Sequence, residues 1–305
     1  MTTKKTYYSN GKLLITGEYV VLDGALAFAL PTKFGQDLVV ENGTKQEISW
    51  KSFDQDGSIW FEKTIPFSDI VNKTVFENQP EKNTLIAILH EAYRLNPKFI
   101  NESKGYIATT HLTFPKFWGL GTSSTLINNI AQWINIDAYT LLKNSFGGSG
   151  YDIACAQNDT PILYRLVDGK PIIEKISFSP DFTKHLYFVY LNKKQSSKTA
   201  IDNYYKKQNS VDRLIPTIDT ITKTIIHSKD IETFVSEIEN HEKIMSGILE
   251  TKTVKDTLFP DFTGTIKSLG AWGGDFVLVV SKENPTYYFK EKGYETILPC
   301  SEIIL

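Results

Sequence analysis

The first part of the chain alternates apolar and polar residues in short runs, which is the pattern of β-strands. Such runs occupy residues 7–8, 13–16, 36–40, 48–53 and 58–63. The last two flank a short polar stretch that ends in Gly57, which predicts a hairpin turn with a glycine at positive φ. The chain is therefore expected to begin mostly as sheet.

Apolar residues then recur at helical spacing in several places. Helices are expected from about residue 83, at 126–134, 137–144, 197–208, 211–226 and 231–249, and at 287–292. Strands are expected at 111–114, 163–167, 172–178, 186–191, 276–280 and 295–298. Strands and helices alternate without a regular βαβ period, which favours an α+β architecture. A break near residues 180–184 predicts two domains, 1–182 and 183–305.

Composition narrows the class of protein. The 305 residues are 41% hydrophobic and 22% charged, with a formal net charge of -2, which is typical of a globular chain and gives no basic excess for nucleic acid. Cys155 and Cys300 lie far apart without metal-type spacing, which favours a reducing compartment. No signal peptide or membrane span is evident. These features predict a cytoplasmic protein with neither nucleic acid nor membrane as a partner.

One glycine-bearing segment precedes a predicted helix. Gly119, Leu120 and Gly121 are followed by three hydroxyl residues, Thr122, Ser123 and Ser124. Glycines let a backbone approach a ligand closely, and the first amides of a helix lack partners within the helix, so such a start binds phosphate. The alternative is that the hydroxyl residues only cap the helix. The segment is neither a Walker A loop nor a dinucleotide fingerprint.

A second segment, residues 147–154, contains three glycines around Ser149 and then Asp152. An aspartate held at such a turn could orient a substrate hydroxyl and accept its proton during phosphoryl transfer. Its alternative role is to cap a helix. Tyr151 stands where a serine-hydrolase elbow would need its second glycine, which excludes that class at this place.

Two further features are weaker when each is taken alone. Lys12 could contact a phosphate, although a solvated lysine at a strand end is the commoner role. The segment Gly270–Asp275, GAWGGD, precedes a predicted buried strand and by itself indicates only a turn. The leading hypothesis from the residues is a kinase that acts on a small molecule.

In this order the segments resemble the galactokinase, homoserine kinase, mevalonate kinase and phosphomevalonate kinase superfamily, the GHMP kinases. GKLLITGEYVVLDGALAFALP, GLGTSS and GAWGGD are similar to its three motifs, and GSGYDIA is similar to its SGxD segment. The likeness covers most of the chain. It is strongest to the mevalonate and phosphomevalonate kinase branch, and within that to a group named for the GYDIA string. It implies an α+β fold with a ribosomal protein S5 domain 2-like N-terminal domain and a ferredoxin-like C-terminal domain.

The resemblance also implies roles for particular residues. Asp152 would be the catalytic base and Lys12 its charge partner, while Ser123 would coordinate Mg²⁺. Gly119, Leu120, Gly121, Thr122, Ser123 and Ser124 would surround the ATP phosphates. The substrate side would be formed by Glu18, Ser149, Gly150, Ser197, Gly270, Ala271, Gly273 and Gly274. The implied reaction phosphorylates mevalonate or phosphomevalonate with ATP and Mg²⁺, and a homodimer is one assembly that the resemblance allows.

Several residues depart from the family pattern. Trp118 and Trp272 stand in glycine segments where small residues are usual, and Leu269 stands where Ser or Thr is common. Leu141 occupies the place of a metal-binding glutamate of mevalonate kinases. The two indoles could narrow the nucleotide site or pack against each other. These departures leave two alternatives open: a diphosphomevalonate decarboxylase-like enzyme, and a noncatalytic protein that binds a nucleotide or metabolite.

Overall fold

The computed structural model describes residues 4–193, 201, 204–205, 211–272 and 274–305. The chain divides into two compact units that are interleaved along the sequence. The first unit comprises Met1–Gly11, Phe34–Lys116 and Gly121–Gln157, and the second comprises Lys12–Lys33, Phe117–Leu120 and Asn158–Leu305. Strands β1 (Lys5–Thr16) and β2 (Ala27–Asn42) each contribute residues to both units. The sequence domains 1–182 and 183–305 differ from these units and stay a prediction.

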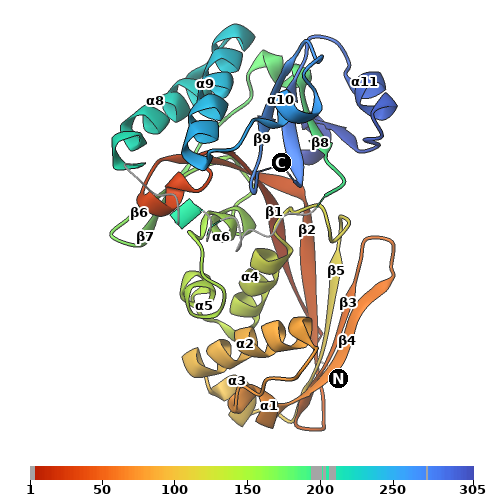
Figure 1. The fold of residues 1–305 in the computed structure, drawn as a ribbon. Coiled ribbons are helices and arrows are strands. Elements are labelled where there is room, and N and C mark those ends of the chain that lie inside the picture. The colour runs from red at the N-terminus through yellow and green to blue at the C-terminus, as the bar shows by residue number, and fades with distance from the viewer. Residues whose placement is uncertain (1–3, 194–200, 202–203, 206–210, 273) are drawn as a thin grey trace. The chain divides into compact units, whose positions relative to one another are not determined.

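The first unit combines three further strands with six helices (Figure 1). The strands are β3 (Glu47–Phe53), β4 (Ile59–Pro66) and β5 (Tyr106–Leu112). The helices are α1 (Phe67–Val71), α2 (Pro80–Leu95), α3 (Lys98–Asn101), α4 (Thr122–Ile134), α5 (Ala138–Ser145) and α6 (Tyr151–Ala156). The sheet order here is β4-β3-β5-β2, in which β3 and β5 are parallel and the other pairs antiparallel.

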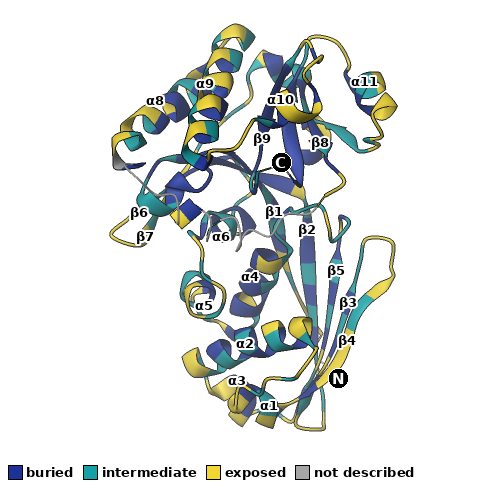
Figure 2. Ribbon diagram, in the orientation of Figure 1, coloured by how far each residue is buried: buried dark blue, intermediate teal, exposed yellow. Residues whose placement is uncertain are grey.

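Alternating side chains explain how this sheet and its helices form one core. In β2 and β3 the inward positions, such as Leu38, Val40, Ile48 and Trp50, are buried, while their neighbours are more exposed (Figure 2). These residues pack with the apolar faces of α2, α4 and α5. Burial of one face of each element therefore holds the helices against one side of the sheet.

The second unit contains two strand groups and several helices. The strands are β6 (Ile162–Val167), β7 (Lys170–Lys175), β8 (Leu186–Tyr190), β9 (Thr265–Ser268), β10 (Phe276–Val280) and β11 (Ile297–Pro299). The α-helices are α8 (Ile215–His227), α9 (Ile231–Leu249), α10 (Val254–Leu258), α11 (Thr286–Glu291) and α12 (Cys300–Ile303). Short 3-10 helices are η1 (Val20–Asp23), η2 (Asp181–His185) and η3 (Val211–Arg213).

In this unit β6 pairs with the first part of β2 and with β7, and a separate antiparallel sheet has the order β11-β8-β10-β9. All positions of β9 and β10 are buried (Figure 2). Helices α8 and α9 lie side by side, and α9 and α10 both contact β9 (Figure 1). Although β9 is an edge strand of this sheet, α9 and α10 contact it and all of its positions are buried, including the charged residue that it carries.

The α+β architecture predicted from the sequence is confirmed, as are the hairpin at β3 and β4 and the helices α2, α4, α5 and α9. Gly57 has the expected positive φ, at 80°. The expected strand at 172–178 ends at Lys175, and strand β9 was not predicted from the sequence. The helix expected at 197–208 lies largely outside the described residues. Among the described residues, no helix is long and apolar enough to cross a membrane.

Candidate functional site

Helix α4 of the first unit begins where the sequence predicted a phosphate-binding start. Its N-cap is Gly121, and no side chain caps the helix there. The Ser124 hydroxyl donates to the Gly121 carbonyl at 2.8 Å, whereas no side-chain hydrogen bond is found for Thr122 or Ser123 within the described part of the chain. Since Ser123 is exposed, its hydroxyl and the first amides of a 13-residue helix remain available to an anion or a metal.

Buried polar contacts fix where α4 begins. The Thr125 hydroxyl donates to the side-chain oxygen of Gln36 at 2.8 Å, and the side-chain amide of Asn129 donates to the backbone carbonyl of Gln36 at 2.9 Å. Both acceptor atoms belong to Gln36 of β2, so these hydrogen bonds fix the position of the first turns of α4 along the sheet. This is the kind of support that a preorganised ligand site requires.

Asp152 lies in the first turn of α6, also in the first unit. The N-cap of α6 is Gly150, with φ 88° and no side-chain cap, so Asp152 is not the capping residue that was its alternative role. Its Oδ1 atom accepts a hydrogen bond from the Ile153 amide at 3.0 Å. The Gln157 side chain donates to Asn128 at 2.9 Å, which joins α6 to α4. Asp152 is half-buried. Its helix, α6, is hydrogen-bonded to α4, the helix that follows the first glycine segment.

Tyr139 and Cys155 form part of the surroundings of Asp152. Burial raises the pKa of the Tyr139 phenol well above its usual value, and the charges of Cys155 and Asp152 add to the rise. The Tyr139 hydroxyl is buried and has no hydrogen-bond partner in the part of the chain that the structure describes. Cys155 is fully buried, as expected of a small apolar residue. Asp152 therefore stands beside a low-dielectric region that strengthens its electrostatic interactions.

Lys12 holds the first part of the glycine segment in the second unit. Its ammonium donates to the Gly119 carbonyl at 2.9 Å, and its backbone amide donates to the Leu120 carbonyl at 2.9 Å. Lys12 thus belongs to the support of this segment. Its pairing with Asp152, which lies in the other unit, stays a prediction.

Asp275 packs directly against Gly119. A Cβ atom on Gly119 would lie 2.3 Å from the Asp275 carboxyl carbon, and Gly119 itself has φ 69°. Asp275 is held in place because its amide donates to the Lys193 carbonyl at 2.6 Å and its carbonyl accepts from the Leu191 amide at 2.7 Å. The carboxylate and Lys12 border the same small hollow of the second unit. Asp275 was not among the predicted site residues, although the GGD string contains it.

Replacing Gly119 by alanine is expected to destabilise the protein through both sterics and backbone strain. The new Cβ would overlap the Asp275 carboxylate, and an L-residue is strained at this φ. The matched control is Gly169→Ala, since Gly169 has φ 71° and no atom within 4 Å of the added Cβ. We expect Gly119→Ala to cost about 2 kcal/mol more unfolding free energy than the control. Urea titration measures both, and equal costs would contradict the close contact.

The two tryptophans of the glycine segments pack against different partners. The Trp118 ring lies 5.5 Å from Phe276 at 88° and 6.3 Å from Tyr190. Trp272 packs with the apolar cluster of Tyr19, Tyr204 and neighbouring helices, and its amide donates to the Tyr19 hydroxyl at 3.2 Å. Each indole therefore stabilises its own segment of the second unit.

Glu18 is buried in the second unit, at 1% exposure, and forms an ion pair with Lys267 of β9. Burial raises the pKa of Glu18 to about 7, against the opposing effect of Lys267. Sequence reasoning missed Lys267. Its only signal was a lysine that directly follows Ile266 in the string TIKSL. The substrate contact expected of Glu18 stays a prediction.

The other expected site residues divide between the units. Ser149 belongs to the first unit, and Gly270, Ala271 and Gly274 belong to the second. Ser197 and Gly273 lie outside the described residues. Leu141 is fully buried in the core of the first unit, so it supplies no ligand. In the described ranges, no group of three or more His, Cys, Asp or Glu side chains is placed to hold a metal.

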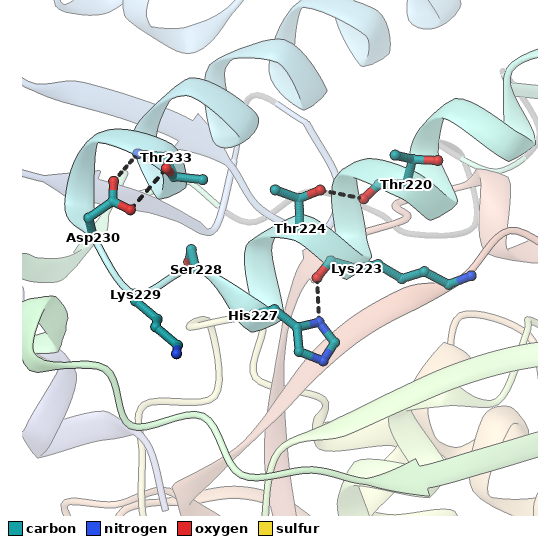
Figure 3. A pocket seen from close by; sticks show the side chains of 8 residues that line it. All are labelled: Thr220, Lys223, Thr224, His227, Ser228, Lys229, Asp230 and Thr233. Atoms are coloured by element: carbon teal, nitrogen blue, oxygen red, sulfur yellow. Dashed lines mark hydrogen bonds between the residues drawn. The ribbon is translucent and has the colours of Figure 1, made fainter.

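A hollow at the turn between α8 and α9 contains none of the expected residues (Figure 3). Its polar groups largely serve their own helices: the Thr224 hydroxyl donates to the Thr220 carbonyl, and the His227 ring contacts the Lys223 carbonyl. Asp230 caps α9 by accepting from the Thr233 amide at 2.7 Å. We therefore assign this hollow no ligand.

No protein-family model matches the sequence. No curated protein matches it significantly. Solved structures do match the fold along nearly the whole chain. The mevalonate kinase of Methanococcus jannaschii is 16% identical, with 97% of this chain and 96% of that one covered and a TM-score of 0.69.

Two other kinases are similar in the same way. Streptococcus pneumoniae phosphomevalonate kinase, in complex with phosphomevalonate and AMPPNP, is 14% identical with a TM-score of 0.71, covering 96% of this chain and 99% of that chain. Lactococcus lactis galactokinase, complexed with galactose, is 11% identical with a TM-score of 0.67, covering 95% and 88%. At these identities the likeness concerns the fold. The chain therefore has the α+β fold of the GHMP kinases.

Proposed function

We propose that this protein is a kinase that uses ATP and Mg²⁺ to phosphorylate the hydroxyl group of a small acid or of its phosphate ester. Mevalonate and phosphomevalonate are the acceptors that we place first. The cytoplasmic location and a homodimer remain predictions that accompany this proposal.

One observation carries the proposal: the uncapped start of α4 and Asp152 on α6 belong to the same unit, and Asn128 and Gln157 bond the two helices. The first supplies amides and a hydroxyl for phosphate oxygens, and the second supplies a carboxylate for a substrate hydroxyl. The fold shared with kinases of three different substrates supports the same chemistry.

In the proposed reaction the acceptor hydroxyl oxygen attacks the terminal phosphorus of ATP. Asp152 takes the hydroxyl proton, the bond to the bridging oxygen breaks, and ADP leaves with the electron pair of that bond. The α4 amides would bind phosphate oxygens throughout. Lys12 holds Gly119 and Leu120 in the second unit, so its first role is to shape the glycine segment.

The Ser123 hydroxyl is the group that we propose for Mg²⁺. It is exposed, follows Gly121 by two residues and has no side-chain hydrogen bond among the described residues, so it is free to turn toward a metal. Mg²⁺ neutralises phosphate charge when it is bound with ATP. Leu141 cannot contribute, and the remaining ligands would come from the phosphates or from water.

A binding protein without turnover is the second candidate. Leu141, buried in the core at the place of a family metal ligand, is the observation that favours it. A decarboxylase of the same fold remains a further alternative from the sequence.

A panel assay separates these functions. The purified protein is incubated with ATP, Mg²⁺ and, in turn, mevalonate, phosphomevalonate, diphosphomevalonate, homoserine and galactose, while ADP and CO₂ are measured. We expect ADP to form with mevalonate or phosphomevalonate, without release of CO₂. Tight nucleotide binding without ADP from any acceptor would overturn the kinase in favour of a binding protein, and CO₂ release would identify a decarboxylase.

A further inference from the structure

Four ionisable side chains meet without access to solvent in the second unit. The Lys267 ammonium donates to Glu18 Oε1 and, at 2.8 Å, to the Ser268 carbonyl. Glu242 Oε2 lies 4.0 Å from the same ammonium. His241 Nε2 lies 3.6 Å from Glu18 Oε2. We call Glu18, His241, Glu242 and Lys267 the buried charge cluster.

The carboxylate of Glu18 is buried away from solvent and paired in this arrangement. Its side chain is 1% exposed, and one oxygen is committed to a lysine that is itself fully buried. Contact with a substrate would require this ion pair to break and leave Lys267 without its principal partner in a medium of low dielectric. The geometry therefore argues against a direct substrate contact by Glu18.

The buried charge cluster adjoins, along the chain, two segments that the sequence analysis identified: the one that contains Gly17 and the GAWGGD segment. Glu18 follows Gly17, whose amide donates to His241 Nε2 at 3.0 Å. Lys267 and Ser268 end β9, immediately before Leu269 and the GAWGGD segment. The ion pair thus joins the turn after β1 to the strand that leads into the third glycine segment.

A second contact joins the same two segments. The Tyr19 hydroxyl accepts the Trp272 amide proton at 3.2 Å, and Tyr19 holds the unfavourable backbone conformation φ 62°, ψ -53°. A residue stays in such a conformation only where its surroundings impose it. Glu18 and Tyr19 are adjacent, so the cluster and this hydrogen bond act on one short turn.

The cluster holds fewer positive than negative groups. Glu242 Oε1 accepts from the Ser268 amide and hydroxyl, whereas Glu242 Oε2, Glu18 Oε2 and His241 Nδ1 are buried and have no hydrogen-bond partner among the described residues. Since Nε2 accepts the Gly17 amide proton, His241 is neutral with its proton on Nδ1. Two carboxylates then face one ammonium, and Asp256 of α10 adds further negative potential at Glu242. Such a cluster favours uptake of one proton.

The directions of the pKa shifts agree with this excess of negative over positive groups. Burial raises the pKa of Glu18 to about 7 and raises that of Glu242, and it lowers the pKa of His241 well below its usual value. The neighbouring Tyr19 phenol has a pKa raised to about 12 by burial, so it stays neutral. Glu18 is therefore the member of the cluster that changes charge near neutral pH, and the pKa of Glu242 is shifted in the same direction.

We propose that Glu18 and Lys267 are positioning residues: their buried ion pair holds the turn Gly17–Tyr19 and the segment Leu269–Trp272 in the arrangement that the reaction uses, without contact to the substrate. This inference rests on the proposed kinase function for its kinetic consequence. Its structural consequence is independent of that function.

The test variant is Glu18→Gln, which keeps the size of the side chain and removes its charge. Amide hydrogen exchange is measured on the full chain, with Glu283→Gln as an exposed control in the same unit. We expect exchange at Gly17–Tyr19 and Leu269–Trp272 to become about tenfold faster, while α2 in the first unit is unchanged. Unchanged exchange at both segments would overturn the inference, whether or not the protein is a kinase.

Kinetics then separate positioning from substrate binding. With the acceptor that the panel assay identifies, Glu18→Gln should lower kcat about tenfold, change KM less than about twofold and lose an ionisation near neutral pH. A large rise in KM at unchanged kcat would make Glu18 a ligand and overturn the proposal. If Glu18→Gln does not fold, Tyr19→Phe serves instead, and it should speed exchange at Leu269–Trp272; no change there would overturn the link between the two segments.

Discussion

Replacing Lys267 by methionine is expected to lower the free energy of unfolding by about 3–5 kcal/mol at pH 8. The variant removes the only cation of the buried charge cluster and leaves Glu18 and Glu242 buried together. Denaturant titration measures the loss. The double variant Lys267→Met, Glu18→Gln should recover part of it, because one of the two uncompensated carboxylates is then gone.

The matched control is Lys282→Met, since Lys282 pairs with Glu232 on the surface at 3.0 Å. Water screens an exposed pair, so this variant should leave the unfolding free energy nearly unchanged. Equal losses in the two lysine variants would contradict the buried cluster.

Lower pH should reduce the cost of removing Lys267. The pKa of folded Glu18 is raised from 4.5 to about 7, so folded protein keeps a proton that unfolded protein releases between these values. This contribution of Glu18 to stability is present below pH 4.5 and is lost as the pH rises through 7. At pH 5 the carboxyl group is mostly neutral and no longer needs the lysine. A deficit in Lys267→Met that stays the same from pH 8 to pH 5 would speak against proton uptake by the cluster.

Replacing Asp152 by asparagine is expected to lower turnover by about two to four orders of magnitude, the usual contribution of a positioned general base. The amide keeps the size of the side chain but cannot take the proton of the acceptor hydroxyl. Nucleotide affinity should change little, because the α4 amides and Ser123 are proposed to carry that binding. Steady-state kinetics and a nucleotide titration check the two halves of this expectation.

Asp159→Asn is the control for Asp152→Asn, because it makes the same change of charge at an exposed position seven residues further along. Its turnover should match that of the unchanged protein. Turnover retained by Asp152→Asn would remove this residue from the proposed mechanism, while a loss shared by both variants would indicate an effect of net charge.

The features that the sequence predicted best depend on neighbouring residues. Helix α4 and its uncapped start follow from two glycines, three hydroxyl residues and a helical apolar face within one stretch of chain. The β3–β4 hairpin follows in the same way from two alternating runs around Gly57. Local patterns of this kind determine the backbone conformation and the buried face of one element, so such elements can be predicted without a structure.

The buried charge cluster was not predictable by such means. Strand β9 reads as polar, because Lys267 and Ser268 make up half of it, yet all four positions are buried. The lysine is tolerated only because Glu18, 249 positions earlier, neutralises it. His241 is fully buried within α9, and its partner Gly17 lies 224 positions away in the sequence. Pairing over such separations is a property of the fold.

The same limit applies to Asp275. Its string suggested a turn, whereas its carboxylate fills the space that a side chain at Gly119 would need. The two residues lie far apart in sequence, and nothing near either of them indicates the other. Packing between distant segments decided the role of this glycine.

The interleaving of the two units also bears on how the chain is made. The polypeptide passes between units at five points, after residues 11, 33, 116, 120 and 157. Residues 12–33 therefore leave the ribosome long before their partners in α9 and β9. Lys267, the ion-pair partner of Glu18, is synthesised 249 residues later, which takes roughly 10 to 50 seconds at ordinary synthesis rates. During that interval the apolar residues near Glu18 are not yet buried by the C-terminal part of the second unit. The nascent second unit, and not the first, is therefore the part expected to need a chaperone.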